Sequence, residues 1–164
     1  MNFIEYTNTW AKNEVLQGRI MIGIGILVII AFFGIIRSEN ELLRGAIIPF
    51  GILVVALVGY GSYILYSRPA HAVESIAQFE KSKAEAIVLE KEKHINDNKA
   101  GKTLMKIYPI LAILSLTVLF FGVPGYYKGM VIGFALLFIS FYVIDNGFIS
   151  RSDAFLEYLN STTF

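Results

Sequence analysis

The 164-residue sequence contains no cysteine, which excludes disulfide bonds, cysteine-ligated zinc and thiol catalysis. Charged residues are also scarce, at 16% of the chain, against roughly 25% in ordinary soluble domains. The formal net charge is only +1, so the chain lacks the basic excess typical of a surface that binds nucleic-acid phosphates. We therefore expect no nucleic-acid partner.

Histidine is scarce as well, and the two that occur, His71 and His94, stand 23 residues apart. Neither is followed four residues later by a second metal ligand, so no metal site is predicted. We expect no acid to pair with either histidine, so no Ser-His-Asp set is predicted, and no glycine-rich phosphate loop follows a strand. The sequence thus predicts a protein that is not an enzyme and needs no cofactor.

Long apolar runs make up most of the chain. They cover about residues 20–36, 45–66, 107–123 and 129–149. Asp145 is the only formal charge inside any of them. A bilayer core of about 30 Å requires about 20 apolar residues in a helix, and each run approaches that length. The sequence predicts an all-α integral membrane four-helix bundle in a lipid bilayer, built from transmembrane hairpins at 20–66 and 107–149.

A polar interval, residues 67–106, separates the two hairpins and holds eight of the fourteen Lys and Arg residues. We predict a cytoplasmic charged helical linker here. It should begin after a break at Arg68-Pro69, because the residue before a proline is pushed away from helical geometry, and it should end near Gly101. A thin apolar seam along this helix predicts contact either with the chain's own membrane segments or with a second protomer.

The two ends of the chain are more mixed in character. Residues 1–19 carry Phe3, Tyr6 and Trp10 at spacings of three and four, which places the three rings on one helix face. Because Trp and Tyr favour the headgroup region, we predict an interfacial amphipathic segment. Residues 150–164 are predicted to form a short cytoplasmic tail.

The distribution of Lys and Arg predicts the orientation of the chain. Eleven of them fall in the two ends and the linker, and three fall in the connections on the other side. The positive-inside rule then places both termini in the cytoplasm. A composition rich in Ile, Lys, Asn and Phe favours a bacterial source, and hence the bacterial inner membrane.

The two hairpins resemble each other in sequence. Phe32-Phe33-Gly34 ends the first apolar run as Phe120-Phe121-Gly122 ends the third, and Arg44-Gly45 recurs as Lys128-Gly129. Two copies of a two-span unit would be related by a pseudo-two-fold axis along the membrane normal. Chance matching between apolar sequences is the alternative interpretation.

Gly125, Gly129 and Gly133 form a ladder on one face of the fourth apolar run. Small residues four apart let two helix backbones approach closely, so the ladder predicts a helix-packing site. The partner is either another helix of the same chain or a second copy in a homo-oligomer.

Asp145, with Asn146 and Ser140 nearby, forms a possible intramembrane polar site. An ionisable residue inside a span is a candidate functional residue. The simpler interpretation is an ion pair with Arg68 or Arg151 near the end of the span, with the Ser140 hydroxyl bonded to a carbonyl of its own helix. The other interpretation is a proton or cation relay.

These observations favour a non-catalytic polytopic membrane protein, acting as a subunit or scaffold that packs with itself or with other membrane proteins. The alternative is an oligomeric ion channel or small transporter that uses Asp145 and the buried hydroxyls. An enzyme acting on lipid is disfavoured, because no cluster of nucleophile, base and metal ligands can be found in the sequence.

Overall fold

The computed structural model describes residues 2–161, which form helices and contain no strand. The elements are α1 (Phe3–Ile36), α2 (Glu41–Gly45), α3 (Ile47–Val55), a π-helical turn η1 (Ala56–Tyr60), α4 (Gly61–Lys81), α5 (Lys83–Thr117), a 3-10 turn η2 (Val118–Phe121) and α6 (Gly125–Ser161). Four helical segments are long and apolar enough to cross a membrane: Phe3–Ile36, Ile47–Lys81, Lys83–Phe121 and Gly125–Ser161. The predicted all-α chain with four long apolar helices is confirmed.

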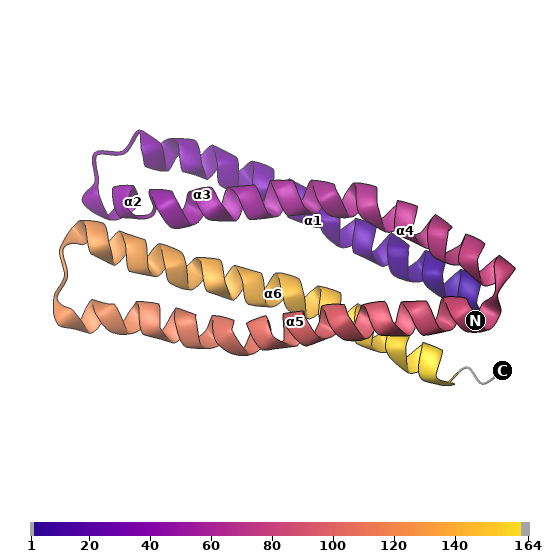
Figure 1. Cartoon of the computed structure of the whole chain (residues 1–164). Helices are drawn as coiled ribbons and strands as arrows, with labels where there is room; N and C mark the ends of the chain where they lie inside the picture. The colour runs from indigo at the N-terminus through magenta and orange to yellow at the C-terminus, as the bar shows by residue number, and fades with distance from the viewer. Residues whose placement is uncertain (1, 162–164) are drawn as a thin grey trace.

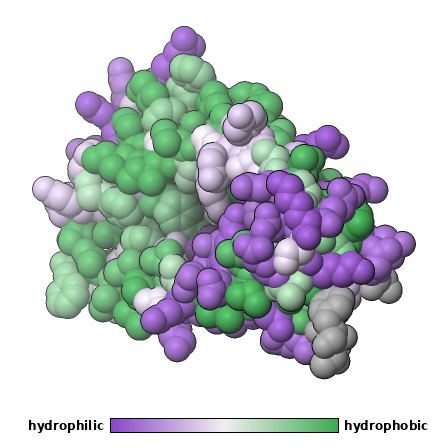
Figure 2. Space-filling model, turned by 45° about the vertical axis from the view of Figure 1, so that its right-hand side comes forward, coloured by the Kyte–Doolittle hydropathy of each residue, from purple (hydrophilic) through white to green (hydrophobic). Residues whose placement is uncertain are grey.

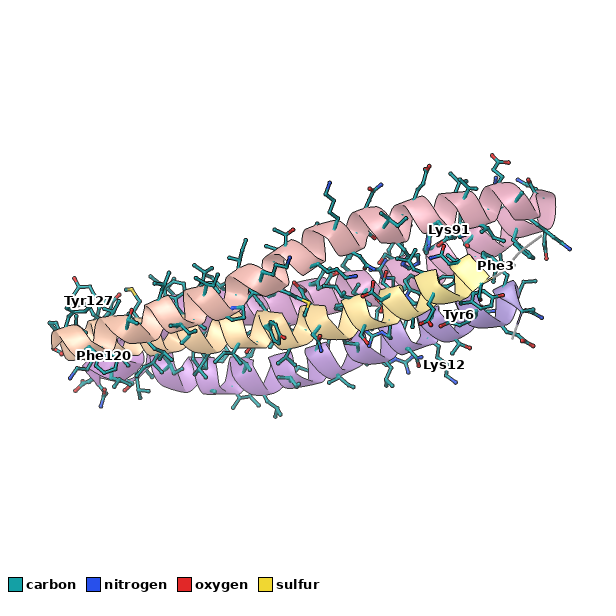
Figure 3. The ribbon with its side chains drawn as sticks, turned by 90° about the horizontal axis from the view of Figure 1, so that it is seen from below. Phe3, Tyr6, Lys12, Lys91, Phe120 and Tyr127 are labelled. Carbon is teal, nitrogen blue, oxygen red and sulfur yellow. The ribbon has the colours of Figure 1, made fainter. Side chains whose placement is uncertain are left out.

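The four long segments run antiparallel to their neighbours in the chain (Figure 1). The start of α1, the turn at Ser82 and the end of α6 lie together at one end of the bundle, which we name the polar end. The connections from α1 to α2 and from η2 to α6 lie at the opposite end, which we name the loop end. Phe3 and Tyr6 mark the polar end in Figure 3, and Phe120 and Tyr127 mark the loop end.

The expected break at Arg68-Pro69 does not occur, because α4 continues through Pro69 to Lys81. The chain turns instead at Ser82, whose extended backbone (φ −151°, ψ 103°) separates α4 from α5. A proline inside a helix costs about 3 kcal/mol when nothing compensates. Here contacts of Arg68 with α1 and of His71 with α5 hold the helix on both sides of the proline.

Gly101 does not end a helix either, since α5 runs from Lys83 to Thr117. A Cβ at Gly101 would lie 2.7 Å from Ile149 Cδ1, so the missing side chain lets α6 approach closely. The polar interval is therefore no separate helix. Two long helices extend beyond the apolar runs and meet at Ser82 as a helical hairpin. Figure 2 shows hydrophilic residues gathered where this end of the molecule comes forward, with hydrophobic residues behind.

The aromatic face of α1 packs on protein. Phe3 is 2% exposed and Trp10 is 5% exposed, and both belong to a core cluster with Phe155 and Leu159 of α6. The Phe3 ring stacks on Phe79 of α4 with centroids 4.2 Å apart. The predicted shared face therefore exists, but neighbouring helices cover Phe3 and Trp10 where we expected lipid headgroups.

Candidate functional site

Glu14 of α1 lies at the centre of a charged network inside the bundle, and it is 1% exposed. Arg151 of α6 donates from Nε to Glu14 Oε1 over 2.7 Å, and Arg68 Nε of α4 lies 3.3 Å from Glu14 Oε2. Arg151 Nη2 also donates to Gln17 Oε1, and the Gln17 amide donates to the carbonyl of Ile144 over 2.9 Å. One buried carboxylate thus joins three helices through two arginines.

Arg68 and Arg151 therefore do not pair with Asp145, which corrects the expectation from the sequence. Asp145 precedes Arg151 by six residues on the same helix, a rise of about 9 Å, and the arginine reaches across to α1 instead. Asp145 accepts a hydrogen bond from the Tyr108 hydroxyl of α5 over 3.0 Å. A partner for Asp145 exists, but it is a neutral side chain.

The other residues of the predicted intramembrane polar site do not join Asp145. The Ser140 hydroxyl donates to the carbonyl of Leu136 over 2.8 Å, as expected for a serine inside a helix. Asn146 is exposed on α6. The three residues therefore form no common polar surface.

A second charged group surrounds Glu90 of α5, which is 5% exposed. His71 Nε2 of α4 lies 3.1 Å from Glu90 Oε2, and His94 Nε2 lies 3.6 Å from the same oxygen. Lys93 Nζ lies 2.7 Å from His71 Nδ1. Since an ammonium group can only donate, His71 carries its proton on Nε2 and donates it to Glu90. Burial raises the pKa of Glu90, but its interactions with His71 and His94 act against burial and lower the pKa to about 2.

The expectation that no acid pairs with the histidines is therefore wrong. His94 also contacts α6, because its Nδ1 lies 2.6 Å from the Ser152 hydroxyl. Ser152, His94 and Glu90 thus follow one another in space, but Glu90 is shared with His71 and lies beyond hydrogen-bonding distance of His94 Nε2. Within residues 2–161 no three carboxylate or imidazole side chains converge in a geometry that could hold a metal ion. The contacts among His71, Glu90, His94 and Ser152 join α4, α5 and α6.

A cleft of about 840 Å³ opens between α4 and α5 and reaches α1 and α6. Towards the polar end its walls carry charged groups, among them Arg68, His71 and Lys93. Further towards the loop end its walls are aromatic. Tyr60 and Phe148 are among the lining residues, and the centroids of their rings lie 5.6 Å apart. Polar and aromatic surfaces therefore follow one another along the axis of the bundle.

The glycine ladder of α6 packs against α2 and α3 of the same chain. A Cβ at Gly129 would overlap the carbonyl of Leu42, and a Cβ at Gly133 would overlap the ring of Pro49. Gly125 lies beside the Glu41 side chain, since a Cβ at this glycine would lie 3.1 Å from Glu41 Oε2. The predicted close packing is present, and the partner is the first hairpin.

Sequence reasoning missed Glu14, Glu90 and Ser152, although two of them had a recognisable pattern. Phe3, Thr7, Trp10 and Glu14 recur at spacings of four, three and four, and all four are buried. Glu14 thus continues an apolar helix face towards the bundle interior. Glu90 precedes His94 by four residues, the spacing at which helix side chains meet. No local pattern indicates Ser152, which meets His94 only through the packing of α6.

Comparison of the chain with protein-family models, with curated proteins and with solved structures finds no match. The arrangement of side chains is therefore the basis on which a function can be assigned.

Proposed function

We propose that this protein is a non-catalytic multi-pass membrane protein of the bacterial plasma membrane, which acts as a subunit or scaffold. The observation that carries the proposal is the internal pairing of its buried charges. Glu14 binds Arg68 and Arg151, and Glu90 binds His71. These groups stabilise the contacts between helices, which is the role expected in a structural subunit. The four apolar segments and the excess of Lys and Arg at the polar end support a membrane placement with that end in the cytoplasm.

A tandem duplication of the hairpin fits this role, and reciprocal contacts support it. The sequence repeat relates Gly45 to Gly129 by an offset of 84, and the same offset relates Leu42 to Tyr126. A Cβ at Gly45 would overlap the carbonyl of Tyr126, just as a Cβ at Gly129 would overlap the carbonyl of Leu42. Exchanging the two hairpins therefore exchanges the two contacts. Within one chain the glycine ladder already packs the second hairpin against the first, so a partner protein must use another surface.

The exposed face of α5 near the polar end is the surface that we assign to a second copy of the chain. Val88 is 54% exposed and Ile95 is 55% exposed, and their spacing of seven residues places both on one helix face. Leu89 beside them is 48% exposed. A seven-residue apolar spacing is the repeat by which helices associate in coiled coils.

Replacing Val88 and Ile95 together by glutamate is expected to reduce the detergent-solubilised particle to a single chain. The protein mass by light scattering should fall from a multiple of 18.3 kDa to that value. Because both side chains are more than half exposed, the unfolding temperature should stay within about 2 °C. Ala100→Glu, which adds an acid at an exposed position on another face of α5, is the control. The subunit role would be contradicted if the wild-type particle contained one chain and no other membrane protein co-purified with it in a fixed ratio.

Transport is a second candidate function, favoured by the position of Asp145 on the wall of the cleft. An ion that entered from the polar end would meet this carboxylate, which Tyr108 binds. In liposomes containing the purified protein, a transport role predicts cation flux that Asp145→Asn reduces at least about tenfold, since one lost charge contact is worth over 1 kcal/mol. Ser140→Ala should leave the flux unchanged. Equal flux in protein-containing and protein-free liposomes would contradict the transport role, and the subunit role would be the remaining proposal.

A further inference from the structure

The cleft between α4 and α5 has the layout of a site for an amphiphile. It crosses the level at which the apolar runs end, which lies near Tyr66 on α4 and Ile149 on α6. Tyr60 lies two turns, or about 12 Å, from Arg68 along the helix, so one molecule can touch both the aromatic and the charged lining. A volume of about 840 Å³ falls within the range of roughly 300–1,000 Å³ typical of small-molecule sites.

Several buried polar atoms of the lining make no hydrogen bond within residues 2–161. His94 is 4% exposed and Trp10 is 5% exposed, yet His94 Nε2 and Trp10 Nε1 make no hydrogen bond, and the buried Ser67 hydroxyl also makes none. A buried polar group without a partner costs free energy, so such groups mark a place where a ligand or water completes the bonding. Two of these groups, the Trp10 indole N–H and the Ser67 hydroxyl, are hydrogen donors, which suits a ligand rich in acceptor oxygens.

The charges of the polar lining have both signs. The contact between His71 and Lys93 sets the antiparallel register of α4 and α5, which places Arg68 across from Asn96 and close to Asp97. Arg68 and Lys93 are cationic, whereas Glu74 and Asp97 are anionic and exposed. A purely anionic ligand would meet two carboxylates here, and a purely cationic ligand would meet two cations. A headgroup that carries both charges matches the lining better than either.

We propose that this cleft binds the phosphoethanolamine group of a phospholipid, with an acyl chain along its aromatic wall. The phosphate contacts Arg68 and the Ser67 hydroxyl. The primary ammonium contacts Asp97 beside Arg68, and its three N–H groups distinguish it from a quaternary choline, which has no hydrogen to donate. Tyr60, Tyr63 and Phe148 supply the apolar wall. The inference rests on the proposed membrane placement but not on the role as a subunit.

The test is native mass spectrometry of the delipidated protein in detergent, with dioleoyl phosphatidylethanolamine, phosphatidylglycerol and phosphatidylcholine added in equal amounts. We expect the ethanolamine lipid to bind about tenfold more tightly than either of the others, the difference made by one charge-assisted hydrogen bond. Asp97→Asn should abolish this preference, and Arg68→Gln should weaken binding of all three lipids. Lys99→Gln, a charge change at an exposed position of the same helix outside the cleft, is the control.

Two outcomes would overturn the proposal. One is equal binding of the three lipids to the wild-type protein, and the other is a preference that survives Asp97→Asn. Because Arg68 also contacts Glu14, the Asp97 variant keeps the test valid if Arg68→Gln fails to fold. Tighter binding of free phosphoethanolamine than of the ethanolamine lipid would assign the site to a soluble ligand instead. The particle mass of Asp97→Asn, measured in parallel, separates loss of lipid from loss of a protein partner.

Discussion

Gly129→Ala is expected to destabilise the bundle by more than the about 1–3 kcal/mol typical of an overpacked core position. The added methyl group would overlap the backbone carbonyl of Leu42, which cannot rotate away as a flexible side chain would. The whole of α6 must move from α2, so the contacts of Gly133 with Pro49 are lost as well. In a chain of this size 1 kcal/mol corresponds to about 2–4 °C, so the unfolding temperature in detergent should fall by at least about 5 °C.

Gly23→Ala is the matched control, because no atom lies within 4 Å of a Cβ at that position of α1. Its unfolding temperature should stay the same or rise slightly, since alanine favours a helix by about 1 kcal/mol over glycine. Gly45→Ala tests the pseudo-symmetry of the hairpins, because it should destabilise the protein as much as Gly129→Ala does. If Gly129→Ala and Gly23→Ala unfold at the same temperature, the close approach of α6 and α2 does not hold.

The four apolar segments could be predicted because each is determined by its own composition. The glycine ladder could be predicted for a similar reason, since its spacing depends on one helix alone. The partner of Gly129 could not, because a small-residue face fits any helix that offers a complementary surface. Only the packing of the two hairpins selects Leu42 and Pro49 as its neighbours.

Pro69 and Gly101 show where local rules fail in this chain. Each residue weakens a helix considered by itself, and each lies inside a long helix here. Tertiary contacts outweigh the local preference at both places. Arg68 binds α1 beside the proline, and Ile149 occupies the space that a side chain at position 101 would fill. A helix end is therefore predictable from a breaker residue only where no neighbouring helix packs against it.

The charged network was mispredicted because Arg68 and Arg151 were paired with the acid nearest in the expected bundle, Asp145. In the structure both arginines bind Glu14, which is 137 residues from Arg151 along the chain. The pattern that places Glu14 inside the bundle was present in the spacing of Phe3, Thr7 and Trp10. A charged residue on an otherwise apolar helix face is buried only with a partner, and that rule indicates that Glu14 needs a positively charged neighbour.

Glu14→Gln is expected to destabilise the protein by about 3 kcal/mol, the lower part of the roughly 3–5 kcal/mol seen when one member of a buried ion pair is removed. The amide keeps the shape of the carboxylate but leaves the guanidinium groups of Arg68 and Arg151 without a counter-charge. Their side chains are 18% and 26% exposed, so water compensates part of the loss. Thermal unfolding in detergent should show a fall of about 6–12 °C.

Removing a second member of the network separates the charge effect from a general packing defect. In the double variant with Arg151→Gln, one of the two unbalanced cations is gone, so the double variant should unfold above the temperature predicted by adding the two single effects. Glu92→Gln, at an exposed position of α5, should leave the unfolding temperature unchanged. Additive single effects would mean that Glu14 and Arg151 stabilise the bundle independently. If Glu14→Gln unfolds at the wild-type temperature, the charged network does not stabilise the contacts among α1, α4 and α6.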